Sequence, residues 1–144
     1  IFELPAVKKG ESVQNAEFSV FFQKIQGDAK GTMPNAQMDV FFKNTGVTSP
    51  EDYQVPAAAS KLDFLTARSI ANAYCVWSGK ELAEAVAANY AGKEKPAKPF
   101  IVFRVRWQER DEALIKNGIV DLYSFGSADP KPPKLKITTA PDHN

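Results

Sequence analysis

The chain has 144 residues, of which 44% are hydrophobic and 24% are charged, and its formal net charge is +1. This composition is typical of a folded globular protein of one domain, and it excludes disordered and collagen-like classes. The balanced charge excludes a general attraction to nucleic acid or to anionic membranes. No apolar run approaches the ~20 residues that a membrane-spanning helix needs, so we expect a soluble protein with no membrane span.

Two similar segments, 16–23 and 36–43, open the folded part of the chain. Each is rich in aromatic and β-branched residues and is predicted to be a strand. Alternation places two sets of apolar side chains on the faces that should line the core: Phe18, Val20 and Phe22, and Met38, Val40 and Phe42. Phe21 and Phe41 fall on the opposite faces, among polar residues. We interpret these two phenylalanines as part of a surface that binds a partner.

The middle of the chain is predicted to be helical. Residues 57–72 are rich in Ala, Leu and Arg, which favours a helix. Residues 73–77, which include Tyr74 to Trp77, fit either a continuation of that helix or a short buried strand, and the pattern does not decide between them.

A second helix is predicted from about Gly79 to Ala91. Ser78 and Glu81 have the spacing of a capping box, in which each side chain accepts a hydrogen bond from a free backbone N–H of the first turn. Gly92 suits a left-handed C-terminal cap.

The second half of the chain contains two further predicted strands, 100–108 and 119–125, with a short helix over 109–116 between them. The first of these strands carries Arg104 and Arg106 on one face, and its other face is apolar. We expect that arginine face to be solvated or ion-paired, and we include both arginines among the candidate partner-binding residues.

Both ends of the chain are predicted to be extended. Residues 1–15 form an N-terminal arm, residues 16–125 a single domain, and residues 126–144 a Pro/Lys-rich tail in which prolines oppose regular structure. Leu135 and Ile137 lie among the tail lysines and are the residues that we expect to dock on a partner.

These elements predict an α+β fold. We expect an antiparallel or mixed sheet of about four strands with helices packed on one face, and with extended N- and C-terminal arms. A sheet covered on one side only would leave its other side available for recognition.

The residues that carry chemistry are few. Cys75 is the only cysteine and His143 the only histidine, and the histidine lies next to the end of the chain, so neither a Cys-His pair nor a zinc site is expected. Phosphate-loop and dinucleotide-binding patterns are absent. We therefore expect no enzyme activity, no cofactor and no metal. The single cysteine is compatible with a reducing compartment, and the first residue, Ile1, with a processed protein, so localisation stays unknown.

The leading functional hypothesis is a non-enzymatic protein–protein interaction module, such as a small accessory or linker subunit of a larger assembly, with other protein subunits as partners. The alternative is a single-stranded nucleic-acid-binding protein that uses the strand face with Arg104 and Arg106. A third hypothesis is a small-ligand carrier or an enzyme whose pocket has no recognisable motif.

Overall fold

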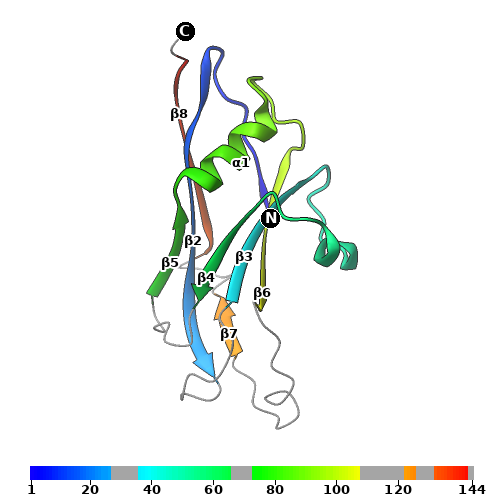
Figure 1. Cartoon of the computed structure of the whole chain (residues 1–144), viewed down its shortest axis with the longest axis vertical. Helices are drawn as coiled ribbons and strands as arrows, with labels where there is room; N and C mark the ends of the chain where they lie inside the picture. The colour runs from blue at the N-terminus through cyan, green and yellow to red at the C-terminus, as the bar shows by residue number, and fades with distance from the viewer. Residues whose placement is uncertain (27–35, 66–72, 108–121, 126–131, 143–144) are drawn as a thin grey trace.

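The protein is mostly β, as a computed structural model shows (Figure 1). The structure describes residues 1–26, 36–65, 73–107, 122–125 and 132–142. The strands are β1 (Phe2–Glu3), β2 (Glu11–Gln26), β3 (Ala36–Lys43), β4 (Ala59–Leu65), β5 (Ala73–Ser78), β6 (Phe100–Trp107), β7 (Leu122–Phe125) and β8 (Lys134–Pro141). A 3₁₀ helix, η1 (Pro50–Gln54), follows β3, and an α-helix, α1 (Lys80–Tyr90), follows β5.

The strands form two antiparallel sheets. The first has the order β1-β6-β3-β4, and the second has the order β5-β2-β7, with β8 also paired to β2. Strand β2 is long enough to pair with β8 near its start, with β7 near its end, and with β5 on its other side. Figure 1 shows the two sheets side by side, with α1 crossing their upper part and η1 projecting from the side of the first sheet.

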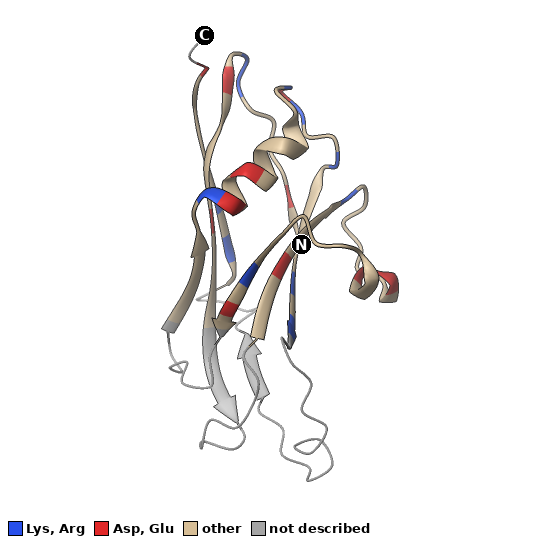
Figure 2. Ribbon diagram, viewed as in Figure 1, with Lys and Arg blue, Asp and Glu red and all other residues tan. Residues whose placement is uncertain are grey.

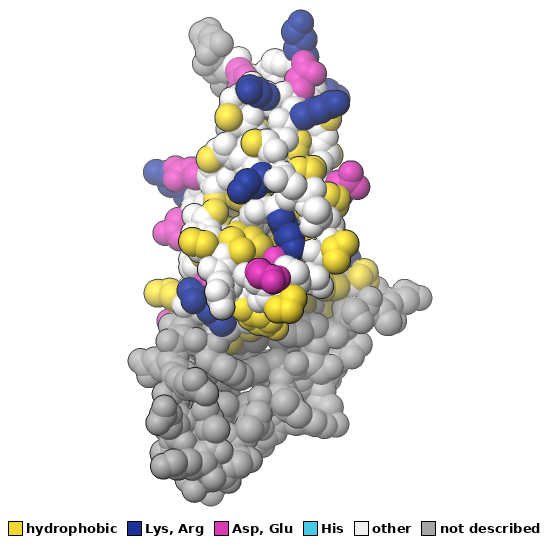
Figure 3. Space-filling model, turned by 90° about the vertical axis from the view of Figure 1, so that its right-hand side faces the viewer, with side chains coloured by type: hydrophobic (Ala, Val, Ile, Leu, Met, Phe, Trp, Pro, Cys, Tyr) yellow, Lys and Arg dark blue, Asp and Glu magenta, His cyan; other side chains and the backbone are white. Residues whose placement is uncertain are grey.

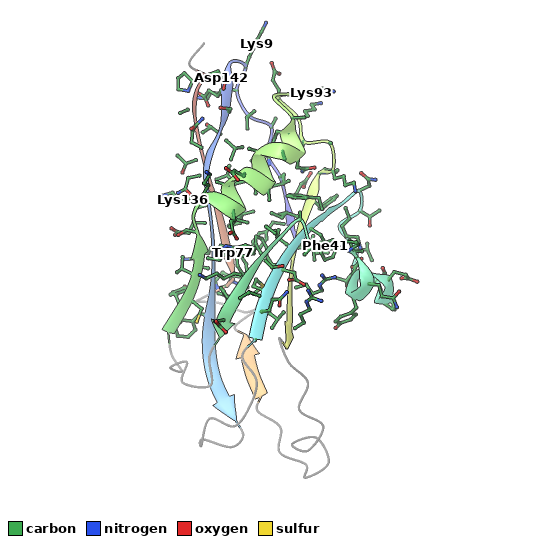
Figure 4. The ribbon with its side chains drawn as sticks, viewed as in Figure 1. Lys9, Phe41, Trp77, Lys93, Lys136 and Asp142 are labelled. Carbon is green, nitrogen blue, oxygen red and sulfur yellow. The ribbon has the colours of Figure 1, made fainter. Side chains whose placement is uncertain are left out.

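The core lies between the two sheets and contains a group of aromatic rings. Phe18 of β2 stacks on Phe103 of β6, with ring centroids 3.8 Å apart and planes 6° from parallel. Phe2 and Trp77 meet Phe103 edge to face, and Figure 4 shows Trp77 in the space between the sheets. Aromatic contacts of this kind therefore join residues from both sheets.

The predicted α+β class is wrong, because the described residues contain one α-helix and two sheets rather than one sheet covered by helices. The main error concerns residues 57–72. The segment that was expected to be helical contains β4, which pairs with β3 through Lys61 and Met38, and residues 66–72 lie outside the described part. Leu62 of this strand is 57% exposed. Pairing with β3 overrides the weak helix propensity of the segment.

The extended C-terminal arm is the second correction. Residues 134–141 form β8, which pairs with β2 over Glu11 to Ser19. Its side chains alternate between exposed and half-buried, as expected of a strand with one side against the core. At the other end of the chain, β1 pairs with β6 and β2 begins at Glu11, so residues 1–15 also contribute to both sheets.

Other predictions agree with the structure. The strands predicted at 16–23, 36–43 and 100–108 correspond to β2, β3 and β6, and residues 73–78 form the strand β5. Of the predicted strand at 119–125, residues 122–125 form β7, while 119–121 and the predicted helix at 109–116 lie outside the described residues.

The predicted helix from Gly79 to Ala91 is also confirmed, although its cap differs. Gly79 is the N-cap of α1 and has no side chain, while Ser78 belongs to β5, so the predicted capping box does not form. At the other end, Ala91 is the left-handed C-cap, with φ 49°, and Gly92 follows with φ 72°.

Candidate functional site at the free edge of β6

Strand β6 has one edge that is only partly covered. It pairs with β3 along its whole length, from Phe100 to Trp107. On its other side it pairs with β1 at Phe100 and Ile101 alone. Among the residues that the structure describes, no further strand lies beside the stretch from Val102 to Trp107. The backbone N–H and C=O groups on that side of β6 are thus candidates for pairing with another strand.

A hollow of about 310 Å³ lies on the inner side of this edge, between the sheets, and we call it the inner hollow. Its lining is apolar and reaches the core: Ile1, Phe2, Phe18, Val20, Met38, Phe103, Val105 and Pro133. Val20 and Met38 are almost fully buried, so the hollow extends to the centre of the sandwich.

A second hollow, of about 370 Å³, lies on the outer face of the first sheet, and we call it the outer hollow. Its floor includes Phe41 and Val102, and η1 forms its wall with Asp52 and Tyr53. Tyr53 is 76% exposed, so its ring is accessible to another molecule. Figure 3 shows this side of the molecule, on which hydrophobic side chains lie between charged ones.

The two hollows share two lining residues, Phe103 and Val105 of β6. Side chains of a strand alternate between its faces, so one strand residue normally lines a space on one face only. A residue can line spaces on both faces where no neighbouring strand separates them. The shared residues therefore show that both hollows lie against the same stretch of β6.

The outer face of β6 also carries a buried charged cluster around Asp39 of β3. The Asp39 side chain is inaccessible to solvent, and its Oδ2 lies 2.7 Å from both Arg104 Nη2 and Arg106 Nε. Its Oδ1 accepts hydrogen bonds of 2.6 Å from Ser60 Oγ and Gln37 Nε2. Figure 2 shows an acidic segment of β3 next to basic segments of β6. The register that pairs Asp39 with Arg104 and with Ser60 brings these groups together across three strands.

The pKa of Asp39 is lowered by this cluster. Burial alone raises the pKa of the carboxyl, but the hydrogen bonds from Ser60, Gln37 and Arg104 and the charge of Arg106 lower it by more. Asp39 is therefore ionised, and it neutralises one of two adjacent guanidinium groups. The cluster of these three ionised side chains keeps a net charge of +1.

Arg104 also fixes the segment that carries η1. Its Nη1 donates hydrogen bonds of 2.7 Å to the backbone oxygens of Asp52 and Val55, and its guanidinium lies 5.1 Å from the ring centre of Phe41. Lys43 Nζ adds an ion pair of 2.8 Å to Asp52. The wall of the outer hollow is thus attached to the sheet by charged contacts at two points.

The structure separates the residues that were predicted to bind a partner. Phe21 and Phe41 are both buried, the first against Tyr74 at 5.2 Å between ring centres and the second beneath η1. Phe41 lies toward η1 in Figure 4. Leu135 and Ile137 are half-buried and pack against the core from β8. Of the residues that were predicted to bind a partner, Phe41 and Arg104 line the outer hollow.

The two arginines differ sharply. Arg104 is buried and donates four hydrogen bonds, whereas the Arg106 side chain is 52% exposed. The expectation of an ion-paired strand face describes both residues. A nucleic-acid site that needs two exposed arginines on this face has one available guanidinium instead of two.

Groups for catalysis or metal binding do not come together in the described part of the chain. No group of three or more His, Cys, Asp or Glu side chains there is arranged to hold a metal ion. Burial raises the pKa of the Cys75 thiol, which is half-buried against the core, so this thiol is not activated as a nucleophile. None of the helices in the described residues is long and apolar enough to cross a membrane.

Several residues of the site were not identified from the sequence. Tyr53 lies in an irregular segment, and Phe103 and Val105 read as ordinary core positions of a strand. A sequence pattern specifies which side chains face the core, but not which strand lies at an edge.

Comparison of the chain with models of protein families, with curated proteins and with solved structures gives no match.

Proposed function

We propose that this protein is a non-enzymatic protein–protein interaction module that binds its partner at the uncovered edge of β6. The observation that carries the proposal is that, among the described residues, no strand pairs with this edge of β6 from Val102 to Trp107, where Phe103 and Val105 line both hollows. Edges of this kind are sites where another chain pairs with a sheet, and natural proteins usually cover or charge them.

The chemistry of the hollows supports a binding role rather than a catalytic one. The inner hollow has an apolar lining. The charged side chains of the outer hollow already have partners, because Arg104 donates a hydrogen bond to the backbone oxygen of Asp52 and the Asp52 carboxylate pairs with Lys43. Both hollows are lined in part by residues of β6. A role as an accessory or linker subunit of a larger assembly is the form of this function that we favour.

Photo-crosslinking in the native cells tests this function. A photoreactive amino acid is placed at Tyr53, beside the outer hollow, and as a control at Glu84 of α1, whose side chain is 65% exposed on another part of the surface. We expect a crosslinked species of higher mass from position 53 and none from position 84. Equal crosslinking at both positions, or none at position 53, would contradict binding at this edge.

A further inference from the structure

We infer that the partner binds by adding an extended strand along β6 from Val102 to Trp107, with apolar side chains facing the inner hollow and an acidic side chain beside Arg106. This inference deepens the proposed function and rests on it, because it specifies the chemistry of the partner at the same edge.

The backbone of β6 determines the form of the partner. Among the described residues, the pairing of β6 with β1 covers Phe100 and Ile101, and the stretch from Val102 to Trp107 has no strand beside it on that side. At ~3.3 Å per residue it offers ~20 Å of strand edge, which is about the length of an ordinary strand. A helix or a compact loop would leave most of these N–H and C=O groups without partners, whereas a strand satisfies them in order.

The inner hollow determines one side of the added strand. All of its lining side chains are apolar, and Phe103 and Val105 lie at its border with the edge. A side chain of a neighbouring strand that faces the same way as these two residues enters the hollow. A polar side chain there would lose its hydrogen bonds to water without replacing them, so the residues facing the hollow must be apolar.

The charge of the Asp39 cluster determines which side chains the added strand carries on the face opposite the inner hollow. Asp39 is shared by two guanidinium groups, so the cluster keeps a net charge of +1, and of the two guanidinium groups that of Arg106 is the exposed one. Arg106 lies on the outer face of β6, opposite the inner hollow. A carboxylate on the adjacent strand comes within reach of this guanidinium, whereas a cation at the same place is repelled. The partner strand therefore alternates apolar and acidic residues.

A peptide titration tests this inference on the intact protein. The probe is a soluble peptide of about seven residues, the length of a common strand, in which glutamate alternates with valine. Two control peptides replace glutamate by lysine, or carry N-methyl groups on the backbone amides that pair. We expect the glutamate peptide to bind and to shift the amide NMR signals of residues 102–107, and we expect neither control to bind.

Variants of the protein identify the contact. Arg106→Gln should weaken binding of the glutamate peptide by about tenfold, the effect of losing one charged hydrogen bond. Lys136→Gln, an exposed cation on β8, should leave binding unchanged. Val105→Phe, which fills the border of the inner hollow, should also reduce binding, and thermal melting of each variant checks that the fold is kept.

The outcomes are separable. No binding of the glutamate peptide, equal binding of the lysine peptide, or dimerisation of the chain through β6 would overturn the acidic-strand inference. If the peptide failed in this way but position 53 still crosslinked to a native partner, the proposed interaction function would stand. If the glutamate peptide did not bind and position 53 did not crosslink, both the function and the inference would be wrong.

Discussion

The two long sides of the sandwich differ in how the space between the sheets is covered. On one side β4 and β5 approach each other, and α1 covers the space between the sheets with Leu82, Val86 and Tyr90, all of which are buried. We call this the closed side. On the other side, the open side, β6 and the segment before β8 leave the inner hollow between them. The chain completes its core on the closed side, and on the open side it leaves core residues within reach of another molecule.

This difference teaches how a small β protein can combine stability with recognition. Burial of helix side chains on the closed side stabilises the fold without any partner. On the open side, the charged cluster around Asp39 links β3, β4 and β6. Substitutions on the two sides should therefore have different consequences for folding and for binding.

The largest effect is expected for Asp39→Ala on the open side. The substitution leaves the buried Arg104 without its carboxylate, which should lower the free energy of unfolding by ~3–5 kcal/mol. Denaturant titration measures the change. Glu84→Ala, which removes an exposed ion pair with Lys80 on α1, is the control and should have a much smaller effect. Equal effects of the two substitutions would show that the cluster does not hold the open side.

A smaller effect is expected for Leu82→Ala on the closed side. Leu82 lies on the buried face of α1, and its truncation should lower the free energy of unfolding by ~2–4 kcal/mol. Val105→Ala is the matched change on the open side. Because Val105 is half-buried and borders an existing hollow, this change should cost at most ~1 kcal/mol. If thermal or denaturant unfolding gave the two variants the same loss, the distinction between the sides would be wrong.

The end of α1 offers a change of opposite sign. Ala91 has the left-handed backbone conformation, which is strained for a residue with a β-carbon. Ala91→Gly should stabilise the protein by ~0.5–1 kcal/mol, whereas Ala88→Gly, within the helix, should destabilise it by a similar amount. Melting temperatures that move in the same direction for both variants would refute the assigned helix end.

The most specific effect is a dependence on pH. Because the pKa of Asp39 is lowered in the folded protein, its carboxylate contributes stability above the unfolded pKa of ~3.9, and this contribution is lost as the pH falls through the folded pKa. Asp39→Asn should therefore be less stable than the parent protein near neutral pH. The difference should shrink in acid, and a constant difference measured over this range would contradict the ionised cluster.

The sequence predicts some elements of this fold and not others for physical reasons. The strands at 16–23, 36–43 and 100–108 are rich in aromatic and β-branched residues, and the helix at 80–90 is rich in Ala and Glu, so local preference and tertiary structure agree. Residues 59–65 contain Ala and Leu, and their pairing with β3 is a long-range contact that local preference does not contain.

The C-terminal strand was missed although its signal is present. Residues 134–139 alternate lysine or threonine with Leu135, Ile137 and Thr139, which is the period of a half-buried strand. The prolines before the strand favoured an extended tail instead. For the candidate site, Arg104 and Arg106 could be selected from the sequence, but the buried Asp39 between them depends on strand register, and the uncovered edge depends on the order of strands in the sheet.

Hydrogen exchange of single backbone amides, followed by NMR on the free protein, tests the uncovered edge of β6 most directly. In a strand paired on one side, the amides that point toward the partner are protected and the alternate amides exchange with solvent. We predict this alternation for residues 102–107, and we predict continuous protection for residues 17–19 of β2, which pair with β5 on one side and β8 on the other. Equal, strong protection of every amide from 102 to 107 would mean that the edge is already covered, and would contradict a binding site there.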